Sequence, residues 1–68
     1  MKYRIFDYVN RSSMFKGTLE EAKEFLLEMA DDNEWSDVEV QAVKDLPIEE
    51  GAIYKWVREN LMCELEEL

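Results

Sequence analysis

The 68-residue sequence has no histidine, one cysteine, one proline and two glycines. Without histidine, no imidazole is available for acid–base chemistry or metal ligation near neutral pH. The single cysteine, Cys63, excludes an intrachain disulfide and a zinc site built from Cys and His side chains. The two glycines, Gly17 and Gly51, lie too far apart to form a phosphate-binding loop. We therefore expect no catalytic residue, no cofactor and no metal ion, and we predict that the protein is not an enzyme.

Basic residues are scarce: 8 Lys and Arg stand against 17 Asp and Glu, for a net charge of −9. Because phosphate neutralisation requires Lys and Arg, this balance disfavours direct binding of nucleic acid. The first 23 residues are an exception, since they hold five of the eight basic residues. They also hold aromatic side chains that could stack on bases, namely Tyr3, Phe6, Tyr8 and Phe15. We favour the interpretation that these rings belong to the core, because the net field repels a phosphate backbone.

Long apolar runs are also missing. No stretch of about 18 apolar residues occurs, so we predict no transmembrane helix and no association with a membrane. The first residues, MKYRIFDYVNR, lack the apolar segment of a signal peptide. An unpaired cysteine is typical of a reducing compartment. The expected location is the cytoplasm.

Apolar residues themselves are plentiful, at 47% of the chain. This content is too high for a disordered acidic tail. We predict one compact domain that spans residues 1–68. A core in a chain of this length is marginal, and a homodimer would extend it.

The first half of the chain carries clear local signals. Residues 2–9 read as a strand, residues 10–13 as a turn, and residues 14–16 as a return strand that ends at Gly17. Thr18 and Glu21 have the spacing of a capping box. The helix that follows has apolar residues three and four apart and ends near residues 31–33. These apolar residues are Leu19, Ala22, Phe25, Leu26, Met29 and Ala30.

The second half predicts a strand and a helix. Residues 38–43 alternate apolar and polar side chains, as in a half-buried strand. Asp45 and Pro47 then favour the start of a helix that continues to a fraying last turn at residues 64–68. Its apolar residues are Ile53, Trp56, Val57, Leu61, Leu65 and Leu68. The predicted fold class is α+β, with the order β-β-α-β-α and a three-stranded mixed sheet that has two helices packed on one face.

Acidic residues recur in a regular pattern along the first predicted helix. Glu20, Glu24 and Glu28 are spaced by four, which places their carboxylates on one stripe at intervals of roughly 6 Å. Such like charges repel one another slightly. One interpretation is a solvated face that keeps the protein soluble. The other is a negative surface that docks on a basic protein. For the second interpretation, the predicted partner-binding residues are Glu20, Glu24, Glu28, Asp31, Asp32, Glu34, Asp37, Glu39, Glu49 and Glu50.

In its size, its acidity and its lack of catalytic residues, the chain resembles small phage-encoded inhibitors of host defence enzymes. Those inhibitors occlude the DNA or RNA groove of restriction enzymes, uracil glycosylases or CRISPR nucleases. The resemblance covers bulk properties and carries no motif, so it assigns a role to no single residue. It implies a basic nucleic-acid-binding enzyme as partner, with carboxylates in the place of phosphates.

The alternative function is an apolar interaction or assembly module. It would dimerise or dock on a partner helix, and the acidic residues would serve solubility only. The side chains expected to be exposed for such a contact are Met14, Leu27, Trp35, Leu65 and Leu68.

Overall fold

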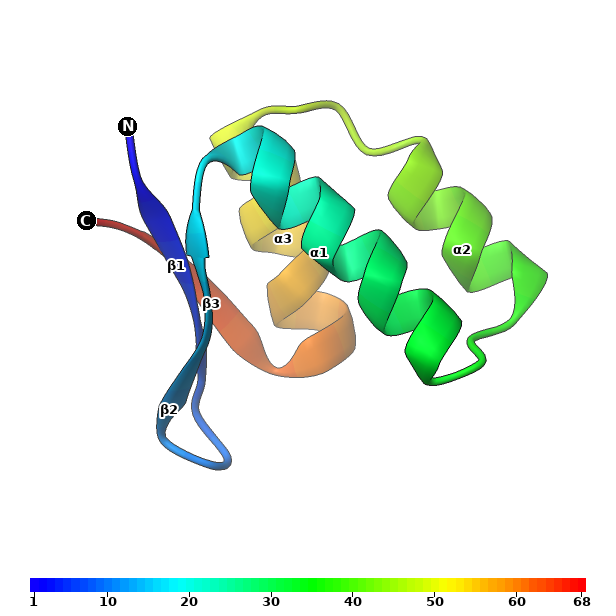
Figure 1. Ribbon diagram of the computed structural model, residues 1–68, viewed down its shortest axis with the longest axis horizontal. Helices are drawn as coiled ribbons and strands as arrows, with labels where there is room; N and C mark the ends of the chain where they lie inside the picture. The colour runs from blue at the N-terminus through cyan, green and yellow to red at the C-terminus, as the bar shows by residue number, and fades with distance from the viewer.

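Three strands form one antiparallel sheet, and three helices lie to one side of it (Figure 1). The computed structural model describes all 68 residues. The elements are β1 (Tyr3–Asp7), β2 (Ser12–Gly17), α1 (Leu19–Asp32), α2 (Asp37–Lys44), α3 (Glu50–Leu61) and β3 (Cys63–Glu67). The sheet has the order β2-β1-β3. The α+β class is confirmed, but the order of elements is β-β-α-α-α-β, with one more helix than predicted.

The predicted N-terminal hairpin is present, but its turn covers residues 8–11 instead of 10–13, and β2 begins at Ser12. β1 and β2 pair antiparallel with Tyr3 opposite Gly17, and a bulge shifts the register between Ile5 and Phe6. The turn is held by the Asp7 carboxylate, which accepts hydrogen bonds from the backbone N–H groups of Val9 (2.9 Å) and Asn10 (3.3 Å). It also accepts one from the Asn10 side chain (2.8 Å). Short polar side chains that bond to nearby backbone in this way stabilise tight turns.

These bonds give the hairpin a predictable response to acid. Hydrogen bonds from the Asn10 side chain and then its backbone hold the pKa of Asp7 below its ordinary value. A lowered folded-state pKa adds stability that is present above the unfolded pKa of about 4 and is lost as the pH falls through the folded value. The melting temperature of the wild type should therefore exceed that of Asp7→Asn at pH 6, and the gap should narrow below about pH 4. A difference in melting temperature that stays constant down to pH 2 would contradict a lowered pKa of Asp7.

The capping box that begins α1 is confirmed. The Thr18 hydroxyl accepts from the backbone N–H of Glu21 (3.2 Å), and the Glu21 carboxylate accepts from the backbone N–H of Thr18 (3.0 Å). The helix ends at Asp32, with Asn33 as its C-cap. Ala22, Leu26 and Ala30 are its buried residues.

No helix of the protein has the length and apolar character needed to cross a membrane.

The strand predicted over residues 38–43 is wrong, because this segment lies within helix α2. Ser36 is the N-cap, and its hydroxyl accepts from the backbone N–H of Glu39 (3.3 Å). Val43 is fully buried and Val40 is half-buried, whereas Val38 is 80% exposed. The apolar residues that contact the core are thus three apart rather than two. α2 packs on α1 and not on the sheet (Figure 1).

The helix predicted to start at Asp45 and Pro47 and to continue to residue 68 is wrong at both ends. Asp45 is the C-cap of α2, and α3 begins only at Glu50. α3 ends at Leu61, where Met62 takes the left-handed conformation (φ 55°) as the C-cap. The chain then turns back as β3 and pairs antiparallel with β1, with Leu65 opposite Ile5. Acidic residues are unfavourable at a helix C-terminus, and this exit places them in a strand instead. The third strand therefore comes from the C-terminus, and the sheet is antiparallel throughout rather than mixed.

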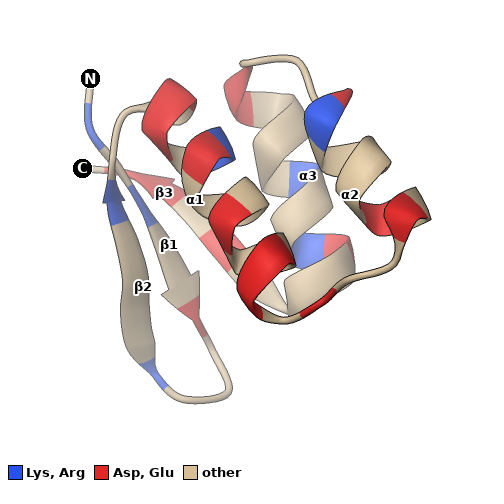
Figure 2. Ribbon diagram, turned by 45° about the vertical axis from the view of Figure 1, so that its right-hand side comes forward, with Lys and Arg blue, Asp and Glu red and all other residues tan.

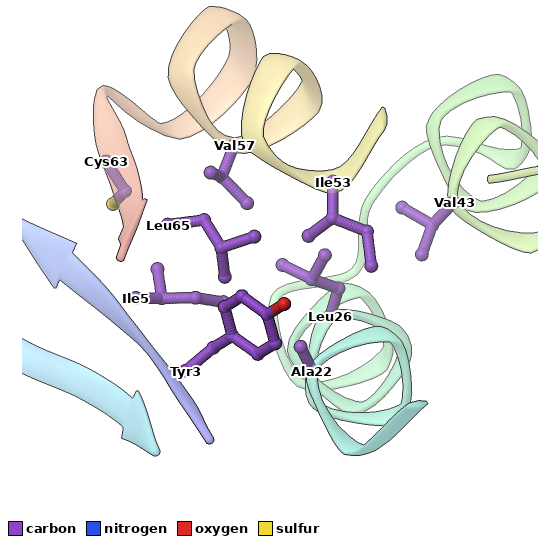
Figure 3. Packing of buried hydrophobic residues seen from close by; sticks show 9 residues of the cluster. All are labelled: Tyr3, Ile5, Ala22, Leu26, Val43, Ile53, Val57, Cys63 and Leu65. Atoms are coloured by element: carbon purple, nitrogen blue, oxygen red, sulfur yellow. The ribbon is translucent and has the colours of Figure 1, made fainter. Parts of the chain in front are cut away.

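The core lies between the inner face of the sheet and the helices α1 and α3 (Figure 3). β1 and β3 contribute alternate residues to it, and the helices contribute residues one turn apart. Phe15 stacks on Phe25 beside this cluster, with ring centroids 5.2 Å apart. The nine buried residues of the cluster are Tyr3, Ile5, Ala22, Leu26, Val43, Ile53, Val57, Cys63 and Leu65.

Candidate acidic binding surface

The structure leaves all ten predicted partner-binding carboxylates exposed. We call this set of ten residues the acidic surface. Glu20, Glu24 and Glu28 follow the outer side of α1, and Asp31 and Asp32 lie in its last turn. Figure 2 shows the acidic residues of α1 and of the first turn of α2 on neighbouring parts of one side of the molecule. The remaining members are Glu34 in the α1–α2 turn, Asp37 and Glu39 in α2, and Glu49 and Glu50 at the start of α3.

No residue of the acidic surface takes part in an ion pair. The protein has two salt bridges, Arg4–Glu66 (2.8 Å) and Arg58–Glu64 (3.7 Å). Both use carboxylates of β3 instead. Within the acidic surface, one carboxylate accepts a side-chain hydrogen bond, that of Glu39 from the Ser36 hydroxyl (3.0 Å). The other carboxylates are free to interact with a partner.

Lys23 lies on the same helix as the acidic stripe, where its charge could offset that of neighbouring glutamates. The structure gives it another partner. Its ammonium donates to the backbone carbonyls of Lys44 and Leu46, both at 2.7 Å. These carbonyls lie at the C-terminal end of α2, where a positive charge is favourable. Lys23 thus ties α1 to α2 and neutralises no carboxylate of the stripe.

The aromatic residues of the hairpin do not form one stacking platform. Tyr3 is buried in the core and Phe15 packs against it, whereas Phe6 and Tyr8 belong to the opposite face of the sheet. On that outer face the Arg4 guanidinium lies 5.1 Å from the centre of the Phe6 ring. The Tyr8 hydroxyl donates to the Glu64 carboxylate.

β3 places two carboxylates, Glu64 and Glu66, on this outer face of the sheet, although the hairpin sequence alone is rich in basic residues. The hydrogen bond to Glu64 is the main cause that raises the pKa of Tyr8, and burial of Tyr8 and then the negative charge of Glu64 raise it further. Glu66 binds the Arg4 guanidinium through both Nε (3.0 Å) and Nη2 (2.8 Å). Sequence reasoning missed this network because it assigned these residues to a helix.

Cys63 is a packing residue. It is 2% exposed, and its Sγ atom lies 3.3 Å from the carbonyl oxygen of Leu61 and 3.4 Å from the Met14 sulfur. Burial raises the pKa of the Cys63 thiol, and the negative charge of Asp7 adds to this effect. No group of three or more Cys, Asp or Glu side chains is arranged to hold a metal ion.

The five residues expected to form an exposed apolar patch do not form one. Leu65 is 4% exposed and belongs to the core, so this part of the prediction is wrong. Met14, Leu27 and Trp35 are half-buried against the core, and Trp35 packs on Trp56 with ring centroids 5.6 Å apart. Of these five residues, only Leu68 is largely exposed, at 62%.

No family model, no curated protein and no solved structure matches this chain.

Proposed function

We propose that the protein binds a basic protein surface through its acidic surface. The observation that carries the proposal is that ten exposed carboxylates form no ion pair within the protein. Binding would bring them the cations that the fold does not supply. A complementary potential also raises the rate of encounter and fixes the orientation of the two proteins.

The acidic surface is built on ordered elements. The capping box fixes the start of α1, and the ammonium of Lys23 fixes the end of α2 against it. Because the backbone that carries these carboxylates is already ordered, binding has to order the side chains alone, which favours affinity. Along α1, Glu20, Glu24 and Glu28 follow one another at intervals of about 6 Å on one side of the helix.

A row of fixed negative charges is what a nucleic-acid groove recognises in a phosphate backbone. We propose that the partner is a nucleic-acid-binding enzyme and that the protein occludes its groove. The resemblance to phage-encoded inhibitors supports this proposal. A host defence nuclease, such as a CRISPR or restriction enzyme, is the form of partner that follows from it.

The test begins with immobilised protein in a cell lysate at low salt, eluted by a salt gradient. Association of the purified partner is then measured at several ionic strengths. Reversing two charges on α1, Glu24→Lys with Glu28→Lys, should lower the association rate about fivefold at low salt. The control is Asp45→Lys with Glu59→Lys, which changes the net charge equally at exposed positions outside the acidic surface. Its association rate should stay close to that of the wild type.

Two results would contradict the proposal. Affinity that does not change with ionic strength would show that the carboxylates do not drive binding. An equal loss of rate in both double variants would show that net charge alone matters. Occlusion has its own test, since the protein should displace a labelled duplex or guide RNA from the purified partner.

A further inference from the structure

A hollow of about 400 Å³ lies where β1, the start of α1 and the segment before α3 meet. We call it the N-terminal hollow. In Figure 1 these three segments lie together at the end of the molecule that carries the N-terminus. The hollow joins two parts of the acidic surface that are distant in sequence, because Glu20 lines it and Glu49 and Glu50 follow its lining residue Ile48. Its lining residues are Met1, Tyr3, Thr18, Leu19, Glu20 and Ile48.

The walls of the hollow are apolar and only partly covered. Ile48 is 50% exposed and Met1 is 85% exposed, although both side chains are large and hydrophobic. Leu19 is half-buried beside them. An apolar body that entered the hollow would remove this surface from water, which is favourable in proportion to the area covered.

Tyr3, whose hydroxyl has only a weak hydrogen-bond acceptor within the protein, lines the same hollow. Tyr3 is only 6% exposed, yet the one hydrogen bond of its hydroxyl goes to the sulfur of Met1 at 3.8 Å. A thioether is a weak acceptor. Burial and then the negative charges of Glu50 and Glu67 raise the pKa of Tyr3. Glu67 lies opposite Tyr3 in the pairing of β1 with β3.

The hollow thus combines apolar walls, a polar atom without a nitrogen or oxygen partner, and negative charge at the rim. We propose that it receives one arginine side chain from the basic partner, an inference that rests on the proposed function. The aliphatic stem would cover Leu19 and Ile48. The guanidinium, which is weakly hydrated and presents several N–H donors, would bond to the Tyr3 hydroxyl oxygen and the Glu20 carboxylate.

The experiment is an NMR titration of the ¹⁵N-labelled protein with N-acetyl-arginine methylamide. The neutral probe N-acetyl-citrulline methylamide has nearly the same shape and serves as the control ligand. With arginine, the amide shifts of Tyr3, Leu19 and Ile48 should saturate together, at a lower concentration than any shift at Glu24 or Glu28. Citrulline should bind at least about fivefold more weakly, because it has no charge to place among the carboxylates.

Matched variants test the walls. Ile48→Ser should weaken arginine binding about threefold, because it removes apolar area from the hollow. Val38→Ser makes a similar change at an exposed position on α2 and should leave the affinity unaltered. Glu20→Gln is a second variant at an exposed position and should weaken binding as well. The amide spectrum of each variant shows whether the fold is intact.

Several outcomes would overturn the inference. One is a set of shifts spread evenly along α1; another is equal binding of the two probes. A third is equal behaviour of Ile48→Ser and Val38→Ser. Shifts at the hollow that follow protein concentration instead of arginine would assign it to a second copy of the chain. Failure here differs from failure of the proposed function, since a salt-sensitive partner could still respond to the charge reversals on α1 while arginine leaves the hollow unperturbed.

Discussion

Replacing Leu65 with alanine should lower the free energy of unfolding by about 2–5 kcal/mol, whereas Leu68→Ala should change it by less than about 0.5 kcal/mol. Leu65 is 4% exposed and pairs with Ile5 in the centre of the sheet. Its loss would leave a cavity between β1, β3 and α3. Leu68 follows the last strand and is 62% exposed. Small domains are marginally stable, so Leu65→Ala should remove a large part of the total free energy of unfolding.

The two variants are matched in chemistry and differ only in their place in the fold. If residues 61–68 continued α3 as a helix, Leu65 and Leu68 would share its apolar side and both substitutions would cost similar amounts. Urea denaturation followed by circular dichroism gives both free energies under one condition. Equal losses would contradict β3 as the third strand.

The error over β3 shows the limit of local patterns in this chain. The spacing of Leu61, Leu65 and Leu68 fits a helix, and the alternation of Cys63 and Leu65 with glutamates fits a strand equally well. The structure resolves the ambiguity through distant contacts. A lone two-stranded hairpin is marginal in water, and β3 gives β1 a second partner and closes the core with Leu65.

Local signals did predict the elements that they control. The capping box of Thr18 and Glu21 acts within a few residues and forms as expected. The predicted hairpin also forms, but its turn covers residues 8–11 and not 10–13, because Ser12 and Ser13 pair with β1. The acidic stripe of α1 is also local, because a spacing of four fixes the side of the helix. The N-terminal hollow is different. It depends on a strand, a helix and a loop that meet only in the folded chain, so no local pattern marks it.

α2 offers the second test, because a helix and a strand predict opposite results at the same residues. In the helix, Val43 is fully buried while Val38 is 80% exposed on the outer side. Val43→Ala should cost about 2 kcal/mol in lost packing, of which the better helix propensity of alanine returns about 0.5 kcal/mol. Val38→Ala should keep the propensity gain and lose no packing. It should therefore stabilise the protein by up to about 0.5 kcal/mol.

In the strand predicted from sequence, the even positions Val38 and Val40 would share a face with Ala42, and Val43 would lie on the other. Val38→Ala would then destabilise the protein, since alanine is a poor strand residue and leaves a gap on the buried face. The sign of the Val38 effect therefore separates the two structures, and thermal unfolding of both variants measures it. The result also bears on the acidic surface. In the helix, which is capped by Ser36 and packs on α1 through Val43, Asp37 and Glu39 are exposed in the first turn, close to the end of α1.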